Sequence, residues 1–408
     1  MIAVVGAILL FLPGAAWGTG ARSSGWRAQT VGEQQWHLGA MGVARAYDWA
    51  RGDGVVVAVV DSGVDAGTPD LAGALLPGAG FGSAAGTGGT ADENGHGTAM
   101  ATLIAGRAIG GGALGVAPGA RILPVSVGSG GGRFTTASVS SGISWAVDNG
   151  ADVINLSLTS EATLTPDLRH AVDYAFDHDV VVVAGTGNAG VRHVGAPANI
   201  RGVIAVSGTE EGNAVWASSN TGPETVLAAP ARGIVTAVPA GVSSTGYASV
   251  DGTSAATALV SGAAALVRSR FPDLDAGNVV HRLITTAVDL GPAGRDDLTG
   301  FGLVDVVAAL SAEVAPVDRN PLAPPPRTTT ATPPTAPTAP TGEPGDGVAA
   351  TGPEATPRFR LLVAFGGLLL VVVAVVVVAL LLSRRSRPAG PRVVELPPPS
   401  DDFWRHVP

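Results

Sequence analysis

Three short segments of the chain carry residues that together could cleave an acyl bond. Asp61 ends an apolar run, His96 lies between two glycines, and Ser254 stands just before a second apolar run. A serine hydroxyl is inert at neutral pH unless a base removes its proton, and an imidazole oriented by a carboxylate is such a base. Singly, each residue could serve only as a turn or helix cap. Together they predict a serine nucleophile, with His96 as its base and Asp61 as the orienting acid.

The elements that must position these residues alternate between strand and helix. β-Branched runs such as residues 55–60 suit buried strands of a parallel sheet, and stretches of helical period lie between them. The predicted strands cover residues 55–60, 121–127, 153–158, 180–184 and 203–207, and the predicted helices cover residues 99–105, 139–149, 168–177, 254–270 and 275–287, with a last short helix near residue 310. This alternation predicts an α/β fold with a mainly parallel central sheet, whose sites form beyond the carboxyl ends of the strands.

Composition excludes several other chemistries. The 408 residues include no cysteine and no lysine, all 24 basic residues being arginine, and the formal net charge is −9. Without cysteine the chain has no thiol catalysis, disulfide or cysteine-bound zinc, and without lysine it has no Ser–Lys mechanism. The acidic balance argues against nucleic-acid binding. No Asp/Asn cluster resembles a calcium loop, so no metal or other cofactor is expected.

The sequence before the catalytic region predicts an exported protein. Residues 1–17 have the apolar run and the small-residue end of a signal peptide. Residues 18–50 are interpreted as an N-terminal extension, in which His37 is expected to pack or cap rather than to catalyse. The catalytic domain itself is expected at residues 51–311.

The sequence after that domain predicts a membrane anchor. Residues 312–357 are rich in Pro and Thr and form a predicted linker. Residues 361–382 contain neither a charge nor a proline. As a helix they would span about 33 Å, which matches a bilayer core of about 30 Å. Arg384 and Arg385 follow, so the positive-inside rule places residues 383–408 in the cytoplasm and the catalytic domain outside it.

At the three predicted catalytic positions the sequence resembles the subtilisin-like serine proteases, or subtilases. Residues 57–65, Val-Ala-Val-Val-Asp-Ser-Gly-Val-Asp, resemble the aspartate motif of that family. Asn-Gly-His-Gly-Thr at 94–98 is similar to its histidine motif, and Gly-Thr-Ser-Ala-Ala at 252–256 to its serine motif. The resemblance runs from about Gln35 to Leu310. It implies a subtilisin-like three-layer fold and endopeptidase activity on polypeptide substrates, with Asp61, His96 and Ser254 as the triad.

The resemblance also implies roles for other residues. Asn188, in Ala-Gly-Thr-Gly-Asn at 184–188, would bind the oxyanion together with the backbone N–H of Ser254. Extended substrate would pair with Ser157 and Leu158 by strand addition, the glycines nearby supplying the opposing edge and further contacts. These glycines are Gly130, Gly131 and Gly187. Thr159-Ser160 stands where the family often has glycines, which predicts a narrowed pocket and a small residue before the scissile bond.

The order of signal peptide, catalytic domain, Pro-rich stalk and single C-terminal span is similar to that of the mycosins, the membrane-anchored subtilases of type VII secretion systems. The resemblance implies a cell-envelope protease that processes secreted proteins and stabilises the secretion membrane complex. Many mycosins carry disulfide cysteines, so this cysteine-free chain would be a divergent member. Two alternatives stay open: a general cell-surface subtilase without a secretion partner, and a scaffold component whose proteolysis is dispensable.

Overall fold

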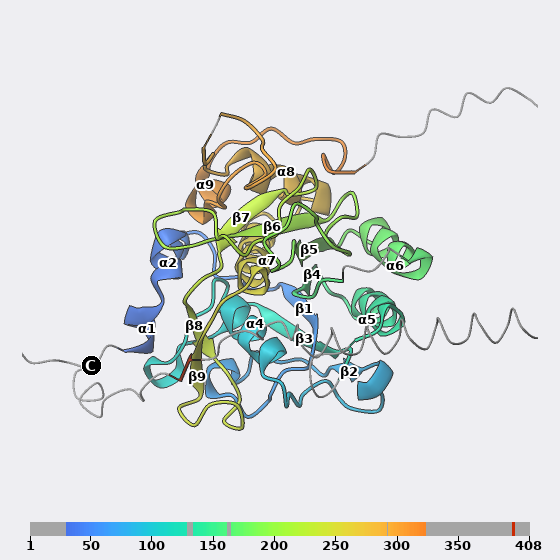
Figure 1. The fold of residues 1–408 in the computed structure, drawn as a ribbon, viewed down its shortest axis with the longest axis vertical. Helices are drawn as coiled ribbons and strands as arrows, with labels where there is room; N and C mark the ends of the chain where they lie inside the picture. The colour runs from blue at the N-terminus through green and yellow to red at the C-terminus, as the bar shows by residue number, and fades with distance from the viewer. Residues whose placement is uncertain (1–29, 129–133, 161–164, 292, 324–393, 396–408) are drawn as a thin grey trace, which may run out of the picture.

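A parallel sheet of seven strands lies at the centre of the described part of the chain (Figure 1). The computed structural model describes residues 30–128, 134–160, 165–291, 293–323 and 394–395. The strand order is β2-β3-β1-β4-β5-β6-β7, and every neighbouring pair is parallel. The strands are β1 Val56–Asp61, β2 Ala79–Gly80, β3 Arg121–Ser126, β4 Val153–Leu156, β5 Val181–Gly185, β6 Ile204–Thr209 and β7 Leu227–Pro230.

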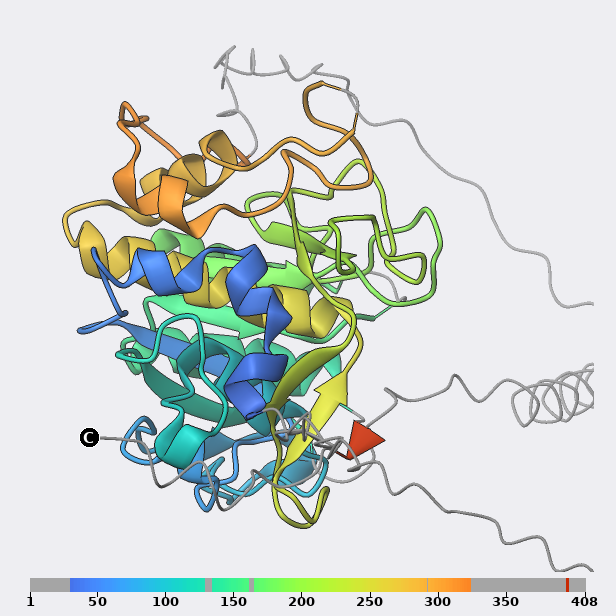
Figure 2. The same cartoon turned by 90° about the vertical axis from the view of Figure 1, so that its left-hand side faces the viewer.

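Helices cover both faces of this sheet and form a three-layer α/β/α arrangement. Figure 1 shows α5 and α6 on one side of the sheet, and α4 and α7 on the other. Figure 2 shows α7 running along the sheet. Both faces of β1 are buried, which is why the strand reads as a continuous valine-rich run. The longer helices are α4 His96–Ala105, α5 Thr136–Asp148, α6 Pro166–Asp177, α7 Thr253–Arg270 and α8 Ala276–Thr285.

Short elements complete the domain. The short helices are α1 Val31–Gln34, α2 Trp36–Ala40, α3 Val43–Ala46 and α9 Val306–Ser311, with 3-10 turns at Pro69–Leu71, Gly82–Ala84 and Ile109–Gly111. Strands β8 Ile234–Ala237 and β9 Tyr247–Val250 form an antiparallel hairpin beside α4. A third strand, β10 Val394–Glu395, pairs antiparallel with β9, with Val394 opposite Ser249.

The predicted alternation of strand and helix is confirmed, and no end of a predicted element is shifted by more than three residues. The largest shifts in the strands are of two residues: β6 ends at Thr209 rather than at residue 207, and β4 ends at Leu156 rather than at residue 158. Here Ser157 leaves the ladder because its side chain and its carbonyl both bond to Ser254. Helix α5 starts three residues before the prediction because Thr135 accepts a hydrogen bond from the backbone N–H of Ser138 and so caps the helix.

The domain begins earlier and ends later than the sequence predicts. Val31 and Val43, from the predicted extension, are almost fully buried. Gln35 binds the backbone of Leu114 through both ends of its side-chain amide, at 2.9 Å each. After α9, Asn320 Nδ2 donates to the Gly202 carbonyl at 3.1 Å. Residues 30–50 are therefore packed into the domain, whereas residues 312–323 lie along its surface, where none of them is fully buried.

The predicted terminal segments lie mostly outside the described residues. This holds for the signal peptide at 1–17, for the linker beyond residue 323 and for the predicted span at 361–382. Within the described ranges, no helix combines the length and the apolar character that crossing a membrane requires.

His37 is a core residue, as expected, but it packs without capping anything. Its side chain is fully buried, and neither ring nitrogen has a hydrogen-bond partner among the described residues. Burial disfavours the charged imidazolium and lowers the pKa of His37 to about 3. The unfolded chain has the ordinary value of about 6.5. Between pH 6.5 and pH 3, His37 is therefore protonated in the unfolded state and neutral in the folded state.

We expect His37 to make the protein sensitive to acid. Its contribution to stability is present above pH 6.5 and is lost as the pH falls towards 3, a loss on the order of 5 kcal/mol in the limit. The His37→Leu variant should therefore be more stable than the wild type at pH 4.5 and should differ much less at pH 8. Urea unfolding at both pH values measures this difference. His193→Gln, at an exposed histidine, is the control, and an unchanged pH dependence in His37→Leu would contradict the assignment.

Candidate active site

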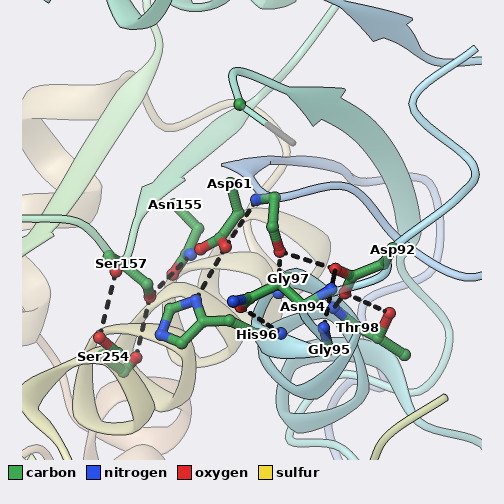
Figure 3. Close-up of polar contacts among 12 residues, drawn as sticks. Asp61, Asp92, Asn94, Gly95, His96, Gly97, Thr98, Asn155, Ser157 and Ser254 are labelled. Atoms are coloured by element: carbon green, nitrogen blue, oxygen red, sulfur yellow. Dashed lines mark hydrogen bonds and ion pairs between the residues drawn. The ribbon is translucent and has the colours of Figure 1, made fainter. Parts of the chain in front are cut away.

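The predicted catalytic residues meet at the carboxyl ends of the central strands. Asp61 is the last residue of β1, His96 the first of α4 and Ser254 the second of α7. His96, Ser254 and Asn188 line one cavity of about 640 Å³. Figure 3 shows the imidazole of His96 between Asp61 and Ser254. The parallel sheet thus assembles residues from three distant segments at the edge where α/β proteins bind ligands.

A short hydrogen bond fixes the imidazole. His96 Nδ1 lies 2.8 Å from Asp61 Oδ1, and the two side chains are 28% and 5% exposed. Asp61 Oδ1 also accepts from the backbone N–H of Ser62 at 2.7 Å, which holds the carboxylate in place. Because the carboxylate accepts a hydrogen bond from Nδ1–H, the neutral imidazole keeps its proton on Nδ1 and presents the lone pair of Nε2 as the base. Nε2 is therefore the atom that can take a proton from a nucleophile.

The surrounding charges favour the protonated form of His96. Burial lowers the pKa of His96, but the charge of Asp61, its hydrogen bond and the more distant charge of Asp92 outweigh burial and leave the pKa above its ordinary value. The cavity also carries Glu210, Arg232 and Asp251 on its walls. An imidazole of this kind is a good acceptor for the proton of a serine, because its conjugate acid is stabilised where it forms.

Ser254 is in its resting position in this structure. Its Oγ donates to the carbonyl of Ser157 at 3.1 Å, and within the described ranges no hydrogen bond joins it to His96. Rotation about the Cα–Cβ bond would turn the hydroxyl towards the imidazole. Looser geometry before substrate binds is usual in catalytic sites. The backbone N–H of Ser254 is among the first of α7, and such groups have no partner within the helix.

Asn188 places an amide donor beside that N–H group. Asn188 Oδ1 accepts from both the backbone N–H and the hydroxyl of Thr253, each at 2.9 Å. Because both groups of Thr253 are donors, the amide oxygen of Asn188 must face them. The NH₂ group of Asn188 is therefore free to donate to another acceptor. A side chain on Gly187 would crowd this segment, since φ is +114° and a Cβ would lie 2.5 Å from Asn220 Nδ2. Asn188 and the Ser254 N–H can together bind an oxyanion.

Asp92 is a positioning residue that sequence reasoning missed. Its Oδ1 accepts from Ser62 Oγ at 2.8 Å and from the Gly95 N–H at 2.8 Å, and its Oδ2 accepts from Thr98 Oγ1 at 2.7 Å (Figure 3). Ser62 Oγ in turn accepts from the Gly97 N–H at 3.0 Å. These hydrogen bonds fix the backbone on both sides of His96 and connect this segment to Ser62, the residue after Asp61. Its sequence signal is an acid four residues before the histidine.

The other predicted substrate-binding residues are only partly described. Ser157 is buried beneath Ser254, and Leu158 lines a second cavity of about 640 Å³. Gly130 and Gly131 lie outside the described residues. Thr159 Oγ1 donates to the Gly185 carbonyl at 2.9 Å. Among the described residues no cluster of three His, Asp or Glu side chains has an arrangement that would hold a metal ion.

Comparison with known proteins agrees with this geometry. The Subtilase family matches residues 52–302. Subtilisin DY from Bacillus licheniformis is 38% identical over 263 residues, which cover 64% of this chain and 92% of that protein. Subtilisin Savinase from Lederbergia lenta is 38% identical over 258 residues, which cover 63% of this chain and 91% of that protein.

Solved structures of similar fold include the following two proteases. The MycP3 protease from the type VII (ESX-3) secretion system superposes with a TM-score of 0.59 at 32% identity, over 68% of this chain and 88% of that chain. A lanthipeptide protease superposes with a TM-score of 0.60 at 28% identity, over 68% of this chain and 94% of that chain. With the family match spanning most of the described residues, the chain belongs to the subtilase family and is a serine endopeptidase.

Proposed function

We propose that Asp61, His96 and Ser254 form the catalytic triad of this endopeptidase. The observation that carries the proposal is the 2.8 Å contact of His96 Nδ1 with Asp61, beside a serine at the N-terminus of α7. His96 Nε2 takes the proton of Ser254 as Oγ attacks the scissile carbonyl. It then gives the proton to the leaving amine. Water then attacks the acyl-enzyme while His96 Nε2 takes its proton. His96 returns this proton to Ser254 Oγ as the new carboxyl end of the substrate leaves.

We further propose that Asn188 and the backbone N–H of Ser254 stabilise the tetrahedral oxyanion. The amide of Asn188 is preorganised because Thr253 holds its oxygen from two sides. Preorganised donors need no rearrangement when the charge forms, which is the source of their catalytic effect.

The acyl half of an extended substrate would run along Ser157 and Leu158 by strand addition. The methyl group of Thr159 lies against the Cα positions of Gly187 and Gly195, since a Cβ at these glycines would be 3.4 Å and 2.4 Å from it. This crowding supports a preference for a small residue before the scissile bond.

The proposed setting is the outer face of a cell membrane, within a type VII secretion system. The likeness to MycP3 supports the secretion role, and the apolar run at 361–382 supports the anchor. The pairing of β10 with β9 stands against this topology, because Val394–Glu395 would lie across the bilayer from the domain.

A general cell-surface subtilase without a secretion partner is the second candidate. Subtilisins are 38% identical to the chain, whereas MycP3 is 32% identical. The Ser254→Ala variant also separates catalysis from a scaffold role: secretion that persists without proteolysis would show that the scaffold acts independently.

Replacing Asn188 by Ala should lower kcat by about 10²–10³ with little change in KM, because the lost donor acts on the transition state. This is the magnitude measured for the corresponding donor in subtilisin. Thr253→Val, which keeps the amide and removes one of the two bonds that orient it, should lower kcat less. Steady-state kinetics on a peptide substrate measures both. A change in KM alone for Asn188→Ala would contradict the oxyanion role.

Asp92 should be visible in the pH profile. The neutral form of His96 is the active base, so kcat/KM rises with pH through the raised pKa of His96. Asp92→Asn removes a charge that raises this pKa, and the acid limb should therefore move to lower pH. Ser62→Ala keeps the charge and removes one hydrogen bond to it. We expect it to lower the plateau by about tenfold without moving the limb. Equal shifts in both variants would contradict the electrostatic role.

The anchor can be tested because the chain has no cysteine of its own. Single variants Ser311→Cys and Ser386→Cys place a thiol on each side of the predicted span. A membrane-impermeant maleimide added to intact cells should label the first and should label the second only after permeabilisation. Labelling of both in intact cells would contradict the cytoplasmic tail and would be compatible with the β9–β10 pairing.

A further inference from the structure

The active-site cavity extends well beyond the catalytic residues, to the segment after β6 and to the β8–β9 hairpin. Its volume of about 640 Å³ lies within the range of about 300–1,000 Å³ typical of ligand pockets. Its walls come from α4, the segment after β6, the β8–β9 hairpin and the start of α7. Trp216, Ala217 and Val242 are apolar wall residues that are at least partly exposed.

Two features assign this cavity to the leaving half of the substrate. The acyl half runs past Ser157 and the second cavity, which Phe134, Val139 and Leu158 line. Among the described residues the two cavities have no lining residue in common. The leaving amine must receive its proton from His96, so the chain that carries it passes the imidazole. The cavity that contains His96 therefore receives the segment after the scissile bond.

We propose that this cavity selects a large apolar side chain, aromatic above all, on the residue directly after the scissile bond. The inference rests on the proposed triad and names part of the substrate class on which that triad acts. The half-buried ring of Trp216 suits an aromatic side chain, since pairs of aromatic rings make favourable contacts.

Hydrogen bonds make the walls rigid before any substrate binds. The backbone N–H of Trp216 donates to the Gly208 carbonyl at 2.9 Å, and its carbonyl accepts from the Ser219 N–H at 2.9 Å. Its ring packs against Gly208, where a Cβ would lie 3.2 Å from Trp216 Cε3. On the other wall, Thr236 Oγ1 donates to the Ala99 carbonyl at 2.9 Å and ties β8 to α4. A preformed pocket costs little to fill, so a well-fitting side chain gains affinity.

The charges at the rim disfavour acidic residues. Arg232 Nη1 lies 2.5 Å from Glu210 Oε2, and these side chains are 59% and 33% exposed, which places them at the mouth. Asp251 Oδ1 accepts from the Gly233 N–H at 2.7 Å. Since Glu210 already pairs with Arg232 and Asp251 keeps its negative charge, an acidic side chain entering the apolar interior would lose its hydration without gaining a free cation as partner.

The test uses the full-length protein in detergent and four internally quenched peptides of one sequence. They differ only in the residue after the scissile bond, which is Phe, Leu, Ala or Asp, and mass spectrometry of the products verifies the bond that is cut. We expect kcat/KM for Phe and Leu to exceed that for Ala by about tenfold or more, with Asp lowest. Values within about threefold of one another, or a preference for Asp, would overturn the proposal.

Variants link the preference to the cavity. Trp216→Ala should reduce the ratio of kcat/KM for the Phe peptide to that for the Ala peptide to about threefold or less. The substrate's phenyl ring then loses the main apolar surface against which it is buried. Trp49→Ala, at a 38% exposed tryptophan on a separate surface near α9, is the matched control and should keep the ratio. Val242→Phe narrows the cavity from the hairpin side and should favour Ala. A ratio unchanged in both Trp216→Ala and Val242→Phe would overturn the proposal.

A p-nitroanilide substrate separates failure of the leaving-side preference from failure of the proposed triad, because no amino acid follows its scissile bond. Turnover of the anilide without discrimination among the peptides would overturn the leaving-side preference and leave the triad standing. No turnover of anilide or peptide by the wild type would overturn the proposed function, and the leaving-side preference with it.

Discussion

The hydrogen bond between Asp61 and His96 is the contact on which the chemistry of this protein depends. A buried carboxylate is costly unless its oxygens are satisfied, and here one oxygen receives both the imidazole N–H and a backbone N–H while the other lacks a partner among the described residues. The carboxylate thus keeps a strong preference for a nearby positive charge. Protonation of His96 supplies that charge, so the site stabilises the imidazolium that peptide hydrolysis must form.

The fold holds this contact in place through backbone geometry more than through side-chain packing. Asp61 is fixed by the end of a central strand, and His96 by the first turn of α4. Asp92 joins the two segments by accepting from Ser62, Gly95 and Thr98. Any loosening of this loop would change the angle of the imidazole, and a misplacement of this kind has large effects on rate.

The start of α7 plays a similar part on the other side of the cavity. It supplies the serine and an unpaired backbone N–H, and Thr253 orients Asn188. Nucleophile and oxyanion donors therefore share one rigid element. The position of that element is fixed by packing against the central strands β4 to β7. The helix is buried over most of its length, which explains its composition of Ala, Val and Leu.

Much of this arrangement could be predicted from the sequence, because long apolar runs and glycine-flanked polar residues have few other uses. That pattern predicts the succession of strands and helices along the chain and the clustering of the three catalytic side chains. Strands β2, β7, β8 and β9 were not predicted, because they are only two to four residues long and, unlike the equally short β4, lie outside the alternation of strand and helix on which the prediction rests.

The supporting contacts of the site were also beyond the sequence pattern. Residues 30–50 read as polar and amphipathic, yet Val31 and Val43 enter the core. An acid four residues before the histidine is the only local signal for Asp92 and does not reveal its role, since its partners Ser62 and Thr98 come together only in the fold. The resting position of Ser254 depends on the carbonyl of Ser157, which lies 97 residues away in the chain.

The most direct test of the account is covalent labelling with a fluorophosphonate, which reacts with serines activated by a base. Digestion and mass spectrometry of the labelled full-length protein should locate the adduct at Ser254. His96→Ala should abolish labelling, while the exposed-site variant His193→Gln should label normally. An unlabelled wild-type protein, an adduct at another serine, or undiminished labelling in His96→Ala would contradict the triad.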